Sequence, residues 1–136
     1  MRRLALLTLL LLAVAGATRA DAAEPQMWQS PSGNIACAAY GGQLRCDMRK
    51  LGVAPPARPS QCMGDWGHAF TLTRNGSKGR RICITDAVGG PGTPTIPYGH
   101  TWRRGGFTCT VRTSEVRCVN GRGHGFGLRI GRQRLF

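Results

Sequence analysis

The stretch Ile35-Ala-Cys-Ala-Ala-Tyr-Gly-Gly-Gln-Leu-Arg-Cys46 predicts a β-hairpin whose two strands are joined by a disulfide. Gly41 and Gly42 fall at its midpoint, and glycine accepts the positive φ angles of a two-residue hairpin turn. Counting outward from this turn, Cys37 lies opposite Cys46 in a non-hydrogen-bonded pair, where the Cα atoms are about 4.5 Å apart. This separation is within the reach of a disulfide.

The other four cysteines extend this hairpin pattern along the chain. Cys109 and Cys118 have the same spacing as the first pair, which predicts a second disulfide-bonded hairpin. Its midpoint, Thr113-Ser114, is a weaker turn signal than Gly-Gly, so a longer or bulged loop is an alternative there. In this register Arg112 lies opposite Glu115, with matching charges. Cys62 and Cys83 then pair by elimination and enclose a third hairpin.

The two halves of the chain carry the same motifs in the same order. Each cysteine hairpin is followed by a similar segment, Gly67-His-Ala-Phe-Thr-Leu72 in the first half and Gly123-His-Gly-Phe-Gly-Leu128 in the second. The first half has an insertion before this segment, which includes Pro55-Pro-Ala-Arg-Pro59. Two copies are too few for a solenoid. We therefore expect an all-β fold, a small disulfide-stapled antiparallel sheet or barrel built from hairpins with a pseudo-repeat.

An exported single domain is the organisation that the sequence predicts. Arg2 and Arg3 precede a short apolar run, which is typical of a signal peptide over residues 1–22 with cleavage near Ala22. An even number of cysteines fits an oxidising compartment, so we expect a secreted or periplasmic protein. Residues 23–136 then form one β-rich domain, with a first half at about 28–86, a linker at about 87–102 and a second half at about 103–136. This length excludes multi-domain enzymes.

Several motifs together carry a resemblance to a known family. They are Ser30-Pro-Ser-Gly-Asn34 before Cys37, Arg45-Cys-Asp47, Ile96-Pro-Tyr-Gly99, and Cys118-x-Asn120 followed by Gly123-His-Gly-Phe126. In these features, which span about residues 28–136, the chain resembles a bacterial family of small exported proteins classed as a domain of unknown function. The resemblance implies export, paired cysteines and a β-rich fold. It implies no catalytic or binding residue.

A large positive charge is the main functional signal of the sequence. The chain has 19 Lys and Arg against 6 Asp and Glu, a net charge of +13, and most of this surplus lies outside the predicted signal peptide. Clustered cations attract polyanions. The candidate anion-binding residues are Arg74, Lys78, Arg80, Arg81, Arg103, Arg104, Arg122, Arg129, Arg132 and Arg134. Expected partners are an anionic polymer, a membrane surface or an acidic protein in the cell envelope or outside it. Export separates the chain from the genome, so we expect no specific nucleic acid.

Catalysis is the weaker interpretation of the remaining residues. We expect a non-catalytic binding or structural module, without a cofactor and without a metal, because the cysteines lack the C-x₂-C spacing of zinc ligands. One alternative is a small basic secreted nuclease that uses His68 or His124, because histidine is suited to acid–base work near neutral pH. Another is a secreted protein inhibitor or effector. Trp28, Trp66 and Trp102 are expected in the core.

Overall fold

The computed structural model of the protein describes residues 24–136, which form ten β-strands. The predicted signal peptide, residues 1–22, lies outside the described residues. The strands are β1 (Met27–Gln29), β2 (Ile35–Tyr40), β3 (Gln43–Met48), β4 (Asp65–Thr73), β5 (Arg80–Ile84), β6 (Thr101–Arg104), β7 (Phe107–Val111), β8 (Val116–Asn120), β9 (Gly125–Arg129) and β10 (Arg132–Leu135). Within this part of the chain, no helix is long and apolar enough to cross a membrane.

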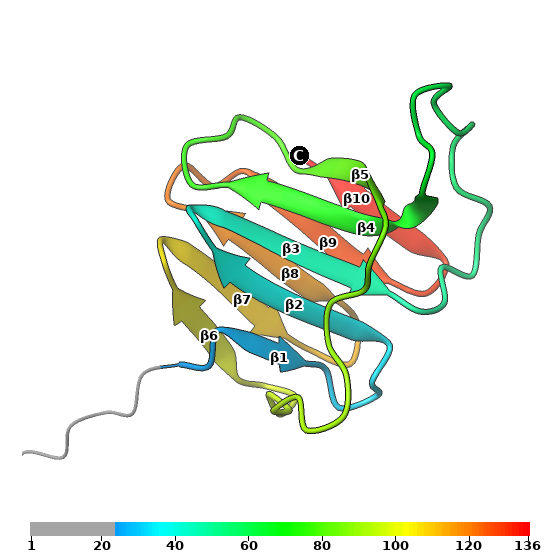
Figure 1. Cartoon of the computed structure of the whole chain (residues 1–136). Helices are drawn as coiled ribbons and strands as arrows, with labels where there is room; N and C mark the ends of the chain where they lie inside the picture. Colours follow the sequence, from blue (N-terminus) through cyan, green and yellow to red (C-terminus); the bar gives the residue numbers. More distant parts are fainter. Residues whose placement is uncertain (1–23) are drawn as a thin grey trace, which may run out of the picture.

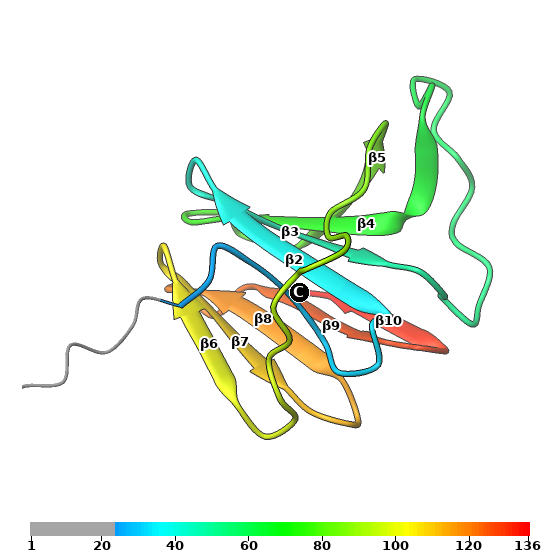
Figure 2. The ribbon, with the colours of Figure 1, turned by 60° about the horizontal axis from the view of Figure 1, so that its bottom comes forward.

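The strands form two antiparallel sheets that pack face to face (Figures 1 and 2). The first sheet has the order β1-β2-β3-β4-β5 and the second has the order β10-β9-β8-β7-β6, so each half of the chain builds one sheet. The predicted all-β antiparallel fold is confirmed, with its hairpins divided between two layers. Each sheet has one apolar face, and this face needs a second layer to leave water.

The hairpin registers agree with the sequence prediction. Cys37 lies opposite Cys46 with the Cα atoms 4.1 Å apart, and Gly41 and Gly42 between them have φ angles of 58° and 76°. Cys109 lies opposite Cys118 with a Cα separation of 4.0 Å. The third disulfide joins Cys62 to Cys83. All three predicted disulfides are therefore confirmed, and they indicate an oxidising environment, extracellular or periplasmic.

The internal repeat appears as two equivalent rows of side chains in the core. One row crosses the first sheet and the other crosses the second, and both run Trp, Cys, Cys, Phe: Trp28, Cys37, Cys46 and Phe70 face Trp102, Cys109, Cys118 and Phe126. The tryptophan ring centroids are 5.7 Å apart, and those of the phenylalanines are 6.2 Å apart. All eight side chains are fully buried. The repeat therefore places the same packing motif on both sides of one shared core.

Trp66 corrects the prediction that all three tryptophans lie in the core. Its side chain is only half-buried, and its Nε1 donates a hydrogen bond to the Pro56 carbonyl at 2.9 Å. Pro56 belongs to the insertion between β3 and β4, which projects from the sandwich in Figure 2. Trp66 thus supports the insertion, together with the Cys62–Cys83 disulfide.

The connection between the sheets runs across the outer face of the first sheet (Figure 1). Arg45 of β3 holds its beginning: Nη1 donates to the Asp86 carboxylate at 2.9 Å and Nη2 to the Asp86 carbonyl at 2.6 Å. The Asp47 carboxylate accepts from Arg45 and from the backbone N–H of Val88, each at distances of 2.8 to 2.9 Å. Further along, Gln29 of β1 bonds to the backbone of Pro94 and Ile96.

Candidate functional site

Four hairpin turns meet at one end of the sandwich and bring cations together. In a meander, alternate turns lie at the same end, and the β2–β3, β4–β5, β6–β7 and β8–β9 turns share the left side of Figure 1. Arg74 joins three of them, since its backbone N–H donates to the Gly42 carbonyl at 2.9 Å and its Nε to the Gly105 carbonyl at 3.1 Å. Six predicted anion-binding residues lie on or beside these turns: Arg74, Lys78, Arg80, Arg103, Arg104 and Arg122. We call these six residues the basic end.

The other four candidates are not part of the basic end, although Arg81 directly follows Arg80 in β5. The Arg81 guanidinium lies 4.7 Å from the ring centroid of Phe70, donates to the Gly67 carbonyl, and has its pKa lowered by burial. Arg129 and Arg132 flank the β9–β10 turn at the opposite end of the sandwich. Arg134 forms a salt bridge with Glu115 at 2.8 Å.

The Arg134–Glu115 salt bridge corrects one detail of the sequence interpretation. Arg112 and Glu115 do lie opposite one another, and the Arg112 N–H donates to the Glu115 carbonyl at 3.0 Å. The Glu115 carboxylate, however, accepts from Arg134 on β10. β10 is separated from β8, the strand that follows Glu115, by β9. Arg134 therefore already has an anionic partner, whereas Arg112 forms no salt bridge within residues 24–136.

A cleft of about 610 Å³ lies at the basic end, and three of its lining residues are cations. Lys78 and Arg80 come from the β4–β5 region of the first sheet, and Arg122 comes from the β8–β9 turn of the second. All three are exposed, and none forms a salt bridge within the described residues. The rest of the lining is Gln43, Thr71, Thr73, Asn75, Gly76, Ser77 and Ile82. The cleft thus offers cations and polar side chains without a carboxylate among its lining residues.

Asn120 at the end of β8 holds the two sides of this cleft together. Its side chain is almost fully buried, and Nδ2 donates to the Thr73 carbonyl at 3.1 Å and to the Gly76 carbonyl at 2.8 Å. Its Oδ1 accepts from the backbone N–H groups of Arg122 at 3.0 Å and His124 at 3.2 Å. Asn120 therefore ties the β8–β9 turn to the β4–β5 turn. The sequence interpretation missed this role, for which the only local signal is an asparagine before a glycine-rich turn.

The acidic side chains of the described residues are largely engaged elsewhere. Asp47 and Asp86 pair with Arg45, and Glu115 pairs with Arg134. The hydrogen bond to Asp47 raises the pKa of Arg45, and the hydrogen bond from Arg45 lowers the pKa of Asp86. The sequence interpretation did not identify this network of ion pairs. The alternation of Arg45 and Asp47 on one face of β3 was the available signal.

The two candidate catalytic histidines lie far apart. His68 belongs to β4, and His124 belongs to the β8–β9 turn, which lies beside the far end of β4. His68 Nδ1 lies 2.7 Å from the Met48 carbonyl, near the start of β4. The backbone N–H of His124 donates to Asn120, which in turn reaches Thr73 at the other end of β4. Five residues of extended strand between His68 and Thr73 span about 16 Å. The two side chains therefore do not form an acid–base pair.

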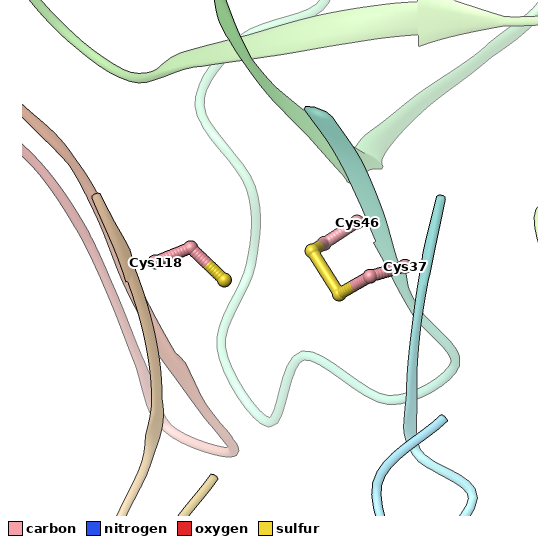
Figure 3. Close-up of side chains that lie close together, drawn as sticks. All are labelled: Cys37, Cys46 and Cys118. Atoms are coloured by element: carbon pink, nitrogen blue, oxygen red, sulfur yellow. A yellow bond between two sulfur atoms is a disulfide. The ribbon is translucent and has the colours of Figure 1, made fainter. Parts of the chain in front are cut away.

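Three cysteine sulfurs come close together between the sheets, as Figure 3 shows. The Sγ atoms of Cys37, Cys46 and Cys118 lie within 4.8 Å of one another, and the side chains are buried. All three belong to disulfides. Metal binding by cysteine requires the thiolate, so this cluster in its oxidised form is a packing feature of the core.

Comparisons with known proteins identify a family but no characterised relative. No curated protein matches the chain, and no solved structure matches it. One family model matches residues 5–136, which is nearly the whole sequence, and its description is Family of unknown function (DUF6636). This is consistent with the resemblance inferred from the sequence motifs. The chain belongs to the Family of unknown function (DUF6636).

Proposed function

We propose that the protein is an exported binding module that attaches to a polyanion through its basic end, without catalysis. The observation that carries this proposal is the cleft lined by Lys78, Arg80 and Arg122, which contains no carboxylate among its lining residues. Unpaired cations in a concave surface attract anions more strongly than cations that already have a partner. Arg74, Arg103 and Arg104 extend the positive charge beyond the cleft.

The location of the protein defines which polyanions it can meet. The three disulfides support an extracellular or periplasmic location. We infer that a signal peptide over residues 1–22 directs the chain there and is removed near Ala22. The polyanions available at such a location are anionic envelope polymers, membrane surfaces and acidic proteins. Among these, an anionic polymer best fits a cleft that continues into a wider basic surface.

A secreted nuclease is the alternative that the geometry favours less. A nuclease with one histidine as acid and one as base would need His68 and His124 side by side. His68 lies near the start of β4, and His124 lies beside its other end. The His68 ring also has a structural contact, since its Nδ1 lies 2.7 Å from the Met48 carbonyl. Neither lines the basic cleft.

Charge substitutions at the two ends of the sandwich test the proposal. The triple variant Lys78→Ala, Arg80→Ala and Arg122→Ala should elute from an immobilised polyanion such as heparin at lower salt than the parent protein. The matched control is Arg112→Ala, Arg129→Ala and Arg132→Ala, which removes the same charge from the opposite end. Single-stranded nucleic acid serves as a second polyanion. The slope of log K against log salt concentration should become smaller in magnitude by about 2 for the first variant, because three cations are removed. Equal shifts for both variants would contradict a localised site.

An RNA hydrolysis assay decides between binding and catalysis. The proposal expects no cleavage of RNA by the oxidised protein. Cleavage that disappears in His68→Ala or His124→Ala, at unchanged thermal stability, would replace the binding proposal with the nuclease alternative.

A further inference from the structure

A second cleft opens at the end of the sandwich opposite the basic end. It has a volume of about 370 Å³, within the range of sites for small molecules. Its walls are the β1–β2 turn, the β7–β8 turn and the β9–β10 turn, and Tyr98 of the connection between the sheets completes it. These segments come from both halves of the chain, so the cleft exists only once the two sheets have packed.

The cleft has an apolar patch within a largely polar lining. Its floor lies over Ile35, Val116 and Leu128, which are buried in the hydrophobic core. Its polar lining residues include Ser32, Thr113 and Ser114. Two further lining residues are exposed apolar side chains, Tyr98 at 42% and Ile130 at 55%. Exposure of the Ile130 side chain to water is unfavourable. Neighbouring exposed apolar groups often mark binding surfaces. An apolar body placed here would cover Tyr98 and Ile130.

The rim of the cleft is positively charged. Arg112 and Arg129 line it, and neither forms a salt bridge within residues 24–136. Glu115 also lines the cleft, but Arg134 donates to both of its carboxylate oxygens at 2.8 and 2.9 Å. The two free guanidinium groups therefore give the rim an excess of positive charge. An anionic group of a ligand is its natural complement.

The β1–β2 wall of the cleft is held in place by its own hydrogen bonds. Ser30 is buried, and its Oγ accepts from the Ile35 N–H at 3.2 Å. Asn34 donates through Nδ2 to the Lys50 carbonyl at 3.2 Å and accepts at Oδ1 from the Lys50 N–H at 2.8 Å. A wall that is ordered before a ligand arrives reduces the entropy cost of binding.

We propose that this cleft binds a small amphipathic organic anion, a molecule with an apolar body and one carboxylate, sulfonate or phosphate group. The apolar body lies against Tyr98 and Ile130, and the anionic group meets Arg112 and Arg129. This ligand class follows from the combination of the exposed apolar side chains of Tyr98 and Ile130 with two cations, Arg112 and Arg129, that form no salt bridge within residues 24–136. The site shares no residue with the basic end, so this proposal can be tested independently of polyanion binding.

Fluorescence titration with anilinonaphthalene sulfonate, an aromatic sulfonate whose emission rises in apolar surroundings, tests this proposal. The variant Arg112→Ala with Arg129→Ala should weaken binding about tenfold, because it removes charge-assisted hydrogen bonds. Tyr98→Ala should weaken binding and shift the emission of the bound probe to the red. The matched control, Lys78→Ala with Arg122→Ala, removes two cations from the basic end and should leave the affinity unchanged.

Competition and a conservative variant complete the test. Octyl sulfate should displace the probe, and inorganic sulfate at the same concentration should not, because it lacks an apolar body. Replacing both arginines with lysine keeps the positive charge and should preserve most of the affinity for the probe. This result would show that the loss in the alanine variant comes from the missing charge and not from misfolding. Unchanged binding in the Arg112→Ala with Arg129→Ala variant, or equal loss in the basic-end control, would overturn the proposal. Displacement by inorganic sulfate would likewise overturn it.

Discussion

Trp28 and Trp102 occupy equivalent positions in the two sheets and pack against one another, with their ring centroids 5.7 Å apart and their planes inclined by 43°. Both side chains are fully buried. Their hydrogen bonding differs, however. Trp102 Nε1 donates to the Pro25 carbonyl at 2.9 Å, whereas Trp28 Nε1 has no hydrogen-bond partner among residues 24–136. The repeat is therefore symmetric in its packing and asymmetric in its polar contacts.

This asymmetry predicts unequal costs for the same substitution. Trp102→Phe should lower the free energy of unfolding more than Trp28→Phe, by about 0.5 to 1.5 kcal/mol, because only Trp102→Phe removes a hydrogen bond to a carbonyl. Both changes remove similar apolar volume, so each variant serves as the control for the other. Urea unfolding monitored by circular dichroism measures the difference. Equal destabilisation would show that the Trp102 hydrogen bond contributes nothing.

The proximity of sulfurs across the core predicts disulfide exchange in a cysteine variant. In Cys37→Ser, the free Cys46 lies within 4.8 Å of Cys118 Sγ. Its thiolate can attack that sulfur, form a Cys46–Cys118 disulfide across the two sheets and release Cys109 as a thiolate. Peptide mapping of the unreduced variant should find this cross-sheet disulfide beside the native Cys109–Cys118 bond.

The control for disulfide exchange is Cys62→Ser, which leaves Cys83 free at the edge of the first sheet. This variant should retain both hairpin disulfides. A Cys37→Ser protein whose only core disulfide is Cys109–Cys118, even after prolonged incubation at mildly alkaline pH, would contradict the prediction.

Asn120→Ala should destabilise the protein by about 2 to 3 kcal/mol. The substitution removes the four hydrogen bonds of a buried amide that hold the two turns together. It should also weaken polyanion binding, because Arg122 loses its fixed position relative to Lys78. Asn75→Ala, an exposed position in the β4–β5 turn, is the control and should change stability by less than about 0.5 kcal/mol. Thermal unfolding and a heparin elution profile measure the two effects.

The contact between Arg45 and Asp86 predicts an acid-sensitive part of the stability. The pKa of Asp86 is lower in the folded protein than in the unfolded chain, mainly because Arg45 donates a hydrogen bond to its carboxylate. The resulting stabilisation is present above the unfolded-state value, about 4, and is lost as the pH falls through the lowered folded-state pKa. Asp86 is well exposed, so the effect is small.

Asp86→Asn therefore should make the unfolding free energy depend less steeply on pH below about 4. Asp65→Asn is the matched control, because Asp65 forms no salt bridge within the described part of the chain. Urea denaturation at a series of acidic pH values measures the slopes. An unchanged slope in Asp86→Asn would show that the contact with Arg45 does not persist in solution.

The hairpins show how much of the fold could be predicted from the sequence. The Gly41-Gly42 turn and the two-residue period of a strand together determine which residues of β2 and β3 lie opposite one another. The same counting places Cys109 opposite Cys118. These relations involve residues close together in the chain, so local geometry is sufficient to predict them.

The candidate site was predictable only as a list of cations. Arg74, Lys78 and Arg134 look alike in the sequence, yet Arg134 pairs with Glu115 while Lys78 lines an acid-free cleft. The alternation of Arg45 and Asp47 on β3 indicates that these two side chains share a face, but nothing in the sequence indicates the contact of Arg45 with Asp86 in the connection between the sheets. The partner of each charge depends on the packing of distant strands.

The sequence by itself determined the hairpin registers, the three disulfides and the division of the chain into two related halves. The registers and two of the disulfides follow from turn chemistry, the period of a strand and the spacing of cysteines over short stretches of chain, and Cys62–Cys83 follows by elimination. Only the tertiary structure decided that the halves form separate sheets, that six cations meet at one end, and that an apolar cleft opens at the other. Those features depend on how two apolar faces pack, because this packing brings distant turns together and selects which charges pair.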